Sequence, residues 1–280
     1  MRLTHNQLKS FFDEGAAIDV QIKAVKGSSP REVGAWMLVN KQRALGTIGG
    51  GQLEYMMIDE ARKLLRLGQT QKTCTVPLGP EIGQCCGGQV DIELALIADP
   101  QAVFDRLEGE RTAKPDVLIF GAGHVGKALA QCLALLPVNP ILIDQRANEL
   151  AQIDGVENRL SPLPEAEVRR AKPGSALVVL THDHALDFLI AGEALLRADF
   201  SYVGMIGSKT KRAVFSNWLE ETYDGQTSAT DLICPIGGAA VSDKRPEVIA
   251  AMVAAQILAS LDQVGQLTKT DKIRGEEHAR

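Results

Sequence analysis

The sequence predicts an α/β protein in which an N-terminal α+β domain precedes a Rossmann-like domain with a doubly wound parallel sheet. Three observations carry this prediction. Strand-like and helix-like segments alternate from residue 116 onward, which is typical of a parallel sheet covered by helices. The segment 116–130, DVLIFGAGHVGKALA, places glycines with G-x-G-x-x-G spacing between a strand and an apolar-faced helix. The length of 280 residues suits about two domains, each with its own core.

Composition and charge narrow the class of protein. A hydrophobic content of 45% with 23% charged residues is ordinary for a soluble globular protein, and a net charge of −5 argues against a nucleic-acid partner. The N-terminus lacks the features of a signal peptide, and no apolar run reaches the roughly 18–20 residues that span a bilayer. Five cysteines, two of them adjacent, make a poor disulfide framework and indicate reduced thiols. We therefore expect a cytoplasmic, ligand-handling protein without a membrane partner.

The N-terminal domain, assigned to residues 1–113, mixes helix, strand and glycine-rich loop patterns. Apolar periodicity predicts a helix at 3–14, strands at 18–25, 35–40, 74–78 and 89–98, and a helix that follows the glycines of 49–51 and runs to residue 67, with Gly68 as its stop. Loops are predicted at 26–31 (KGSSPR) and 79–88, where Gly, Ser and Pro break regular structure. A short helix and a polar linker over 99–115 close this domain.

The C-terminal domain, assigned to residues 114–265, is predicted to alternate strand and helix. The expected strands are 117–120, 140–143, 176–180, 202–206 and 232–236, and the expected helices are 125–136, 185–197, a helix through 218–223, and 246–261. The remaining residues, 266–280, are predicted to form a polar tail.

The glycine triplet forms the first candidate binding site. In the dinucleotide fingerprint Gly121 makes the tight turn, Gly123 lets a ligand approach the backbone, and Gly126 allows close helix–strand packing. The helix that starts beside His124 offers free N–H groups to a phosphate. Asp144 ends the next strand, 23 positions after Gly121, near the spacing at which a carboxylate binds a ribose hydroxyl.

Polar residues after the other parallel strands are expected on the same rim of the sheet, because ligands bind at the carboxyl ends of parallel strands. The residues concerned are His182, Asp183, His184, Ser208, Lys209, Lys211, Arg212 and Cys234. The basic residues suit a phosphate, or they are solvated surface. His182 and His184 with Asp187 form a candidate metal site, but the more usual role of such a group is to cap the helix start, with Thr181 and Asp183 as N-caps.

A second candidate site is the loop QCCGG at 84–88, which lies in the same domain as Gly49, Gly50 and Gly51. A thiolate in a flexible loop can bind a soft metal such as molybdenum or carry sulfur, so Cys85 and Cys86 are candidate ligands beside Gly87 and Gly88. Cys74 and Cys132 lie in strand and helix patterns, where a buried packing role is the better interpretation. Ser28, Ser29 and Arg31 either bind an anion or form a plain turn.

Seven motifs together carry a resemblance to a known family. In order they are GSSPRE (27–32), GTIGGGQLE (46–54), CCGGQV (85–90), FGAGHVG (120–126), THDHALD (181–187), YVGMIGSKTKR (202–212) and CPIGG (234–238). The chain resembles the XdhC/CoxI family of molybdenum-enzyme maturation factors over residues 15–262.

The resemblance implies a chaperone rather than a catalyst. Family members bind the molybdenum cofactor, molybdopterin carrying Mo, while a cysteine desulfurase exchanges an oxo ligand for sulfido, and deliver the cofactor to apo-xanthine dehydrogenase. Cys86 matches the family motif and is the implied molybdenum contact, with Cys85 as its neighbour. We also expect a homodimer, and a nucleotide is an open alternative for the Rossmann pocket. Two other functions stay open, an NAD(P)-dependent oxidoreductase and a module that docks two partners.

Overall fold

The fold is described from a computed structural model that places residues 3–80, 87–150 and 152–265. The chain divides between Glu110 and Arg111 into two compact units, which we call unit 1 and unit 2 and describe separately. Within the described ranges, no helix has the length and apolar character needed to cross a membrane.

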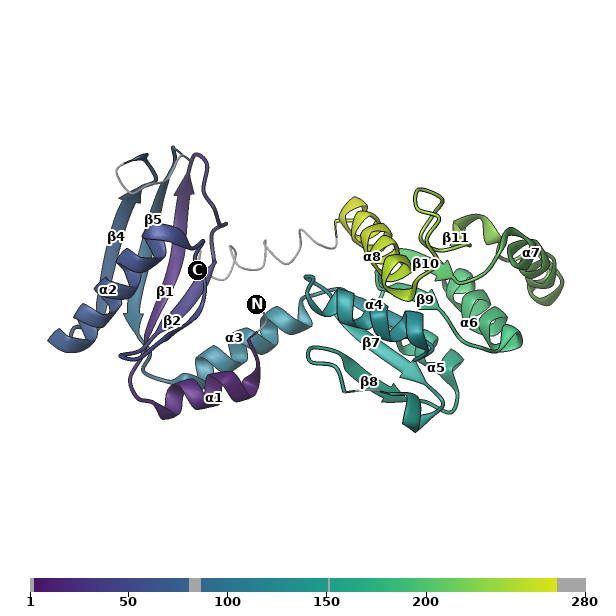
Figure 1. Cartoon of the computed structure of the whole chain (residues 1–280), viewed down its shortest axis with the longest axis horizontal. Coiled ribbons are helices and arrows are strands. Elements are labelled where there is room, and N and C mark those ends of the chain that lie inside the picture. The colour runs from purple at the N-terminus through teal and green to yellow at the C-terminus, as the bar shows by residue number, and fades with distance from the viewer. Residues whose placement is uncertain (1–2, 81–86, 151, 266–280) are drawn as a thin grey trace. The chain divides into compact units, whose positions relative to one another are not determined.

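Unit 1 is an antiparallel sheet with helices on its faces (Figure 1). Its elements are α1 (His5–Asp13), β1 (Ile18–Lys26), β2 (Trp36–Val39), β3 (Ala44–Gly46), α2 (Gly51–Leu67), β4 (Gln71–Pro77), β5 (Gln89–Leu96) and α3 (Pro100–Thr112). The strand order is β3-β2-β1-β5-β4. β3 has three residues, too few for a visible alternation, so the sequence does not predict it.

Alternation along the strands places two apolar layers on the unit 1 sheet. Met37 and Val39 face α2, whereas Trp36 and Leu38 face the layer that α1 and α3 complete. α2 contributes its buried stripe to the first layer, with members at helical spacing: Leu53, Met57, Ala61 and Leu64. Successive side chains of β2 point to opposite faces of the sheet, and all four are apolar, so both faces need an apolar cover.

Local signals fix the helix ends in unit 1. Thr4 and Gln7 form a capping box, with Thr4 Oγ1 accepting from the Gln7 N–H at 3.3 Å and Gln7 Oε1 accepting from the Thr4 N–H at 2.9 Å. α2 ends as predicted at Gly68, which has a left-handed φ of 65° that glycine adopts without strain.

Unit 2 is a six-stranded parallel sheet (Figure 1). Its elements are β6 (Asp116–Phe120), α4 (His124–Ala134), β7 (Asn139–Asp144), η2 (Ala147–Glu149), β8 (Glu157–Leu160), α5 (Pro164–Arg170), β9 (Ala176–Val179), α6 (His184–Arg197), β10 (Tyr202–Met205), α7 (Lys209–Tyr223), η3 (Ala229–Asp231), β11 (Leu232–Ile233) and α8 (Pro246–Gln263). The strand order β11-β10-β9-β6-β7-β8 is the Rossmann order read from one edge. The predicted fold class is confirmed.

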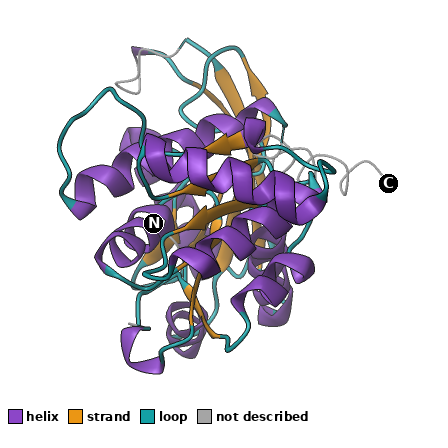
Figure 2. Ribbon diagram, turned by 90° about the vertical axis from the view of Figure 1, so that its right-hand side faces the viewer, coloured by secondary structure: helices purple, strands orange, loops and turns teal. Residues whose placement is uncertain are grey.

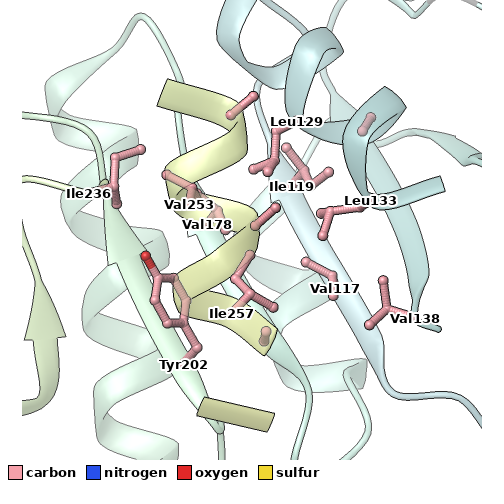
Figure 3. Close-up of a cluster of buried hydrophobic side chains, with 14 of the residues drawn as sticks. Val117, Ile119, Leu129, Leu133, Val138, Val178, Tyr202, Ile236, Val253 and Ile257 are labelled. Atoms are coloured by element: carbon pink, nitrogen blue, oxygen red, sulfur yellow. The ribbon is translucent and has the colours of Figure 1, made fainter. Parts of the chain in front are cut away.

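Helices cover both faces of the unit 2 sheet. Val117 and Ile119 point to the face covered by α4 and α8, and Leu118 and Phe120 point to the face covered by α5, α6 and α7. Figure 3 shows the first layer, where Ile257 and Val253 of α8 pack beside Val117 and Ile119. Figure 2 shows the strands in orange among the purple helices that cover them. Strands buried on both faces explain the continuous apolar runs in this half of the sequence.

The sequence does not predict four elements of unit 2, namely β8, α5 and the two three-residue helices η2 and η3. β8 reads ENRL and lies at the edge of the sheet, so it lacks both an apolar run and alternation. α5 has seven residues, PEAEVRR, and buries only Pro164, Glu167 and Val168. The last strand is also shorter than predicted, because β11 ends at Ile233 and residues 234–236 belong to the following loop.

Candidate functional site

A narrow crevice lies in unit 2 where β6, β7 and β9 end. Its walls include Gly121, Asp144, Gln145, Pro164, His182 and Leu186. β7 and β9 lie on opposite sides of β6, so the crevice marks the point where the order of strands reverses, and open α/β sheets bind ligands there. The cavity volume of this crevice is only about 10 Å³, close to the space that one water molecule needs.

Packing requires glycine at two of the three positions of the triplet. A Cβ on Gly126 would lie 1.9 Å from the carbonyl oxygen of Gly121, and a Cβ on Gly121 would lie 2.5 Å from that of Leu180. Both positions therefore require glycine for packing within the chain. A Cβ on Gly123 would meet nothing within 4 Å, so this position is open at the N-terminus of α4. The arrangement leaves the backbone beside Gly123 and the exposed His124 accessible to a ligand.

Asp144 lies at the crevice, but its carboxylate is already hydrogen-bonded. The side chain is 6% exposed, and Oδ2 accepts from the N–H of Ala122 at 2.7 Å and from Arg146 Nη2 at 3.0 Å. Oδ1 accepts from the N–H and from Nε of Arg146, at 2.9 and 3.0 Å. Burial raises the pKa of Asp144, but the hydrogen bonds from Arg146 and Ala122 outweigh it and lower the pKa overall. The sequence places this carboxylate at the end of a strand beside the glycine turn. It does not show that Arg146 already donates hydrogen bonds to both carboxylate oxygens.

The turn after β9 carries capping residues and does not form a metal site. Asp183 is the N-cap of α6, accepting from the N–H groups of Ala185 and Leu186, as predicted, whereas Thr181 is not an N-cap. The described residues contain no group of three or more His, Cys, Asp or Glu side chains placed to hold a metal. The three side chains expected to form a metal site are therefore not brought together. Asp187 is fully buried and faces inward, whereas His182 and His184 are exposed.

A buried ion pair links two of the sequence motifs. Asp187 Oδ2 lies 2.5 Å from Lys211 Nζ, whose side chain is 11% exposed, and Lys211 also donates to the carbonyl of Ile206 at 3.0 Å. Asp187 Oδ1 accepts from the hydroxyl and N–H of Thr181, at 2.6 and 3.2 Å. The pair fixes the turn that places His182 in the crevice wall.

The basic residues at the start of α7 are only partly available to a phosphate. Lys211 pairs with Asp187, and Arg212 Nη2 donates to the carbonyl of Ala229 at 3.0 Å. Ser208 is the N-cap of α7 and accepts from the Lys211 N–H at 3.2 Å. Of the three cations expected to suit a phosphate, Lys209 is exposed, whereas the side chains of Lys211 and Arg212 already contact groups within the protein.

The described cysteines lie in packed surroundings. Cys74 and Cys132 pack against the cores of unit 1 and unit 2, in agreement with the packing interpretation. Cys234 is buried, and this burial raises the pKa of its thiol although Lys211 and Arg212 lie near. Burial also raises the pKa of the half-buried Cys74 thiol, and a thiol with a raised pKa is a poor nucleophile, so Cys74 and Cys234 are not candidates for sulfur chemistry. Cys85 and Cys86 lie outside the described residues.

Three loops that are distant in the sequence of unit 1 meet at one place. Ser28 and Gly87 form an isolated parallel bridge, and a Cβ on Gly88 would lie 2.1 Å from the Ser28 carbonyl oxygen. A Cβ on Gly49 would lie 2.8 Å from Pro30 Cγ, so the glycine triplet of 49–51 packs against the same turn. We call residues 26–31, 46–51 and 87–88 the unit 1 loop cluster.

Two further contacts shape the unit 1 loop cluster. Glu54 Oε2 accepts from Thr47 Oγ1 at 2.6 Å and from the N–H groups of Ile48 and Gly50 at 3.2 and 3.1 Å. This carboxylate therefore fills the donor-rich start of α2, and the sequence signal was the acidic residue in the first helical turn. Leu78 exchanges two backbone hydrogen bonds with Gly87 and Gly88, which closes the base of the cysteine loop.

The remaining groups of the loop cluster can bind an anion. Lys26, Ser28 and Arg31 are exposed, and Ser29 is half-buried beside them. Cβ atoms on Gly50 and Gly87 would meet nothing within 4 Å, so the backbone there is open to a ligand. Hydroxyl, ammonium and guanidinium groups are the donors that bind phosphate in proteins.

Comparisons with known proteins identify the family. The XdhC Rossmann domain model matches residues 117–257, half of the chain, and the XdhC and CoxI family model matches residues 14–77. YqeB of Escherichia coli K12, named as an uncharacterized protein, is 26% identical over 250 residues, and the match covers 85% of this chain and 42% of YqeB. The chain thus spans less than half the length of that relative.

The fold also has a counterpart among solved structures. A crystal structure of a Bacillus halodurans protein named as a xanthine dehydrogenase superposes with a TM-score of 0.73 at 19% identity, covering 92% of this chain and 95% of that one. At this identity the likeness is one of fold. The family models matched over residues 117–257 and 14–77 carry the identification: the chain belongs to the XdhC and CoxI family.

Proposed function

We propose that this protein is a maturation factor for xanthine dehydrogenase, which binds the molybdenum cofactor, holds it during sulfuration by a cysteine desulfurase, and delivers it to the apo-enzyme. Membership of the XdhC and CoxI family carries the proposal. In this role the protein is a chaperone and insertion factor that turns over no substrate of its own.

The unit 1 loop cluster fits such a cofactor. Molybdopterin bears a phosphate, a polar pterin and a dithiolene that holds Mo. The cluster has exposed cationic and hydroxyl donors in Lys26, Ser28 and Arg31, and open backbone at Gly50 and Gly87. The donors suit the phosphate, and the open glycines leave room for a flat ring to approach the backbone.

Cys86 is the residue that we assign to the metal. It directly precedes Gly87, whose N–H donates to the Leu78 carbonyl at 2.8 Å at the base of the cysteine loop. A thiolate is a soft ligand that suits molybdenum, and the bound cofactor supplies the Mo centre whose terminal ligand is exchanged. The chain's own part is to hold the phosphate, leave the pterin accessible and present the thiol.

The test is a pterin and molybdenum assay on protein loaded with cofactor. We expect Cys86→Ala to lose most of the bound Mo and pterin, because the metal loses its thiolate. Cys132→Ala is the matched control: Cys132 packs against the unit 2 core, so the variant loses packing only and retains its cofactor. Far-UV circular dichroism of both variants checks that they fold.

Two results would contradict the proposal. Absence of pterin from wild-type protein, together with a rise in melting temperature on adding NAD, would favour an NAD(P)-dependent oxidoreductase. Equal loss of cofactor from both cysteine variants would remove the case for a thiolate contact.

A further inference from the structure

The outer side of β4 is an open edge of the unit 1 sheet (Figure 1). At both ends of β4 the backbone groups that face β5 belong to even-numbered residues: the Thr70 carbonyl accepts from the Leu96 N–H at 2.7 Å, and the Leu78 N–H donates to the Gly88 carbonyl at 2.7 Å. Backbone groups alternate in direction along an antiparallel strand. The groups that face outward therefore belong to the odd-numbered residues, which are Gln71, Thr73, Thr75 and Pro77.

This outer edge carries a row of hydrogen-bonding groups that are free to pair. Among the residues that the structure describes, none bonds the outward N–H and C=O groups of Gln71, Thr73 and Thr75, and the three side chains are exposed. An open edge of this kind is a template for another strand. Pro77 has no N–H, so the row of donors ends before it.

The row of free groups is symmetrical about Thr73. If a second β4 runs antiparallel to the first with the two Thr73 residues opposite each other, these residues exchange two hydrogen bonds, and Gln71 of each copy exchanges two with Thr75 of the other. Every outward N–H of β4 is then paired. A register centred on Thr75 would instead place Pro77 opposite Thr73, where the missing N–H breaks the ladder.

The same register suits the side chains on both faces of the sheet. On the exposed face Thr73 meets Thr73 of the second copy, and threonine pairs are favourable across antiparallel strands. On the face covered by α2, Lys72 of one copy lies opposite Cys74 of the other. A lysine near a sheet edge normally discourages pairing, but Lys72 Nζ is balanced by Glu60 Oε2 at 2.5 Å.

A groove beside the start of β4 gives the second strand room. It has a volume of about 670 Å³, and its walls include Glu60, Lys63, Leu67 and Lys72. Leu67 is 60% exposed there. The register places Val76 of the second copy opposite Thr70, on the face of the sheet that α2 covers, so Leu67 gains an apolar neighbour where the two sheets join.

We propose that the outer edge of β4 is the interface between two copies of this chain, which pair antiparallel about Thr73 and join their unit 1 sheets into one. The occupant is a second copy because the free groups and the terminal proline are arranged about one centre, and a two-fold interface requires such self-complementarity. The pairing also places Gln69 of one copy opposite Pro77 of the other, next to Leu78 at the base of the cysteine loop. The interface does not depend on the proposed function, and it gives the expected homodimer a defined surface.

The first test is sedimentation velocity of the full chain at micromolar concentration, for wild type, Thr73→Pro and Thr73→Val. We expect wild type to be a dimer and Thr73→Pro to raise the dissociation constant of the dimer about thirtyfold, because both central hydrogen bonds lose their donors. The Thr73 N–H faces away from β5, so proline removes no hydrogen bond within the unit 1 sheet. Thr73→Val is the matched control, since it keeps the N–H and the β-branch and should remain dimeric.

The second test is disulfide cross-linking on mild oxidation. In the proposed register the two Thr73 Cα atoms lie about 5.5 Å apart, a distance that a disulfide can span, so Thr73→Cys should give a covalent dimer on a non-reducing gel. The two Thr75 residues lie roughly 13 Å apart along the strands, so Thr75→Cys alone should cross-link no more than wild type, which reports the native cysteines. Mixing Thr75→Cys with Gln71→Cys should restore the cross-link, because these positions face each other.

Three outcomes overturn the proposal. The first is a monomeric wild type, which would leave β4 as a free edge that Lys72 and Pro77 protect. The second is a folded Thr73→Pro variant that dimerises as tightly as wild type, because the interface would then lie elsewhere. The third is Thr73→Cys that cross-links no more than wild type, and this result decides alone if circular dichroism shows that Thr73→Pro does not fold. None of these outcomes measures cofactor retention, so the two proposals fail separately.

Discussion

Lys211 and Asp187 show how a single charged pair can hold a site together. Both side chains are nearly or fully buried, and they join the motif after β9 to the motif after β10. The Asp187 carboxylate accepts three hydrogen bonds, one from Lys211 Nζ and two from the hydroxyl and N–H of Thr181. Removing one partner of such a pair leaves the other charge buried and unpaired, which is costly.

We therefore predict that Lys211→Met lowers the free energy of unfolding by about 3 kcal/mol, because Asp187 loses its cation. Urea denaturation at neutral pH measures this change. The double variant Lys211→Met with Asp187→Asn should recover part of the loss, since the amide is neutral and its oxygen still accepts from Thr181. If the double variant is less stable than Lys211→Met alone, the unpaired charge is not the cause.

At this scale the sequence predicts caps better than it predicts partners. Asp183 was identifiable as an N-cap because the capping signal is local. The inward orientation of Asp187 was not identifiable, because its partner Lys211 lies 24 positions away on another helix. Glu54 is the opposite case, because it accepts from groups only four to seven positions before it and its place in the first turn of α2 is a local signal. Local chemistry can be read from spacing, but pairing across elements needs the fold.

The contact between α4 and β6 depends on a single glycine. A Cβ on Gly126 would lie 1.9 Å from the Gly121 carbonyl oxygen, so any side chain must push the helix away from the strand. A Cβ on Gly123, three residues earlier, would meet nothing within 4 Å. The two positions form a natural pair for comparing packing with ligand access.

We predict that Gly126→Ala destabilises the fold by about 3 kcal/mol, whereas Gly123→Ala changes stability by less than about 1 kcal/mol. The physical reason is the backbone clash at Gly126 and its absence at Gly123, where the φ of −72° also suits alanine. Thermal melting followed by circular dichroism compares the variants. Equal destabilisation by both substitutions would mean that the turn, and not the helix–strand contact, sets the requirement.

The elements that the sequence misses share a physical feature. β8 lies at a sheet edge with half-buried or exposed residues, and α5 is too short for helical periodicity to appear. The central strands β6, β7 and β9 are buried and their apolar runs reveal them directly. Periodicity reports burial, so elements that bury little give little signal.

Each unit of the molecule has its own hydrophobic core. Two apolar clusters belong to unit 1, and two others lie on the two faces of the unit 2 sheet. A domain with its own core can fold alone. The alternation of strand and helix in the sequence predicts the parallel sheet of unit 2, but the order of its strands is a property of the whole fold that spacing alone does not give.

We predict that a truncated chain of residues 111–280 folds by itself, because the unit 2 sheet is covered on both faces by helices of the same unit. The truncation keeps the carbonyl groups of Arg111 and Lys114, which accept from Asn139 Nδ2 at 2.7 and 3.2 Å. Far-UV circular dichroism and a cooperative melting transition check the outcome. A non-cooperative melt would show that unit 2 needs unit 1 to fold.

The bridge between Ser28 and Gly87 has a consequence for how the protein is made. These residues are far apart in sequence, and they meet only after β1 has paired with β5, which it does over eight positions from Ile18↔Leu96 to Lys26↔Gln89. Such non-local pairing forms slowly, because the long intervening loop must close first. A chain emerging from the ribosome can therefore not assemble the loop cluster until residue 96 is synthesised and free, so the loop cluster forms in one late step with the closing of the sheet.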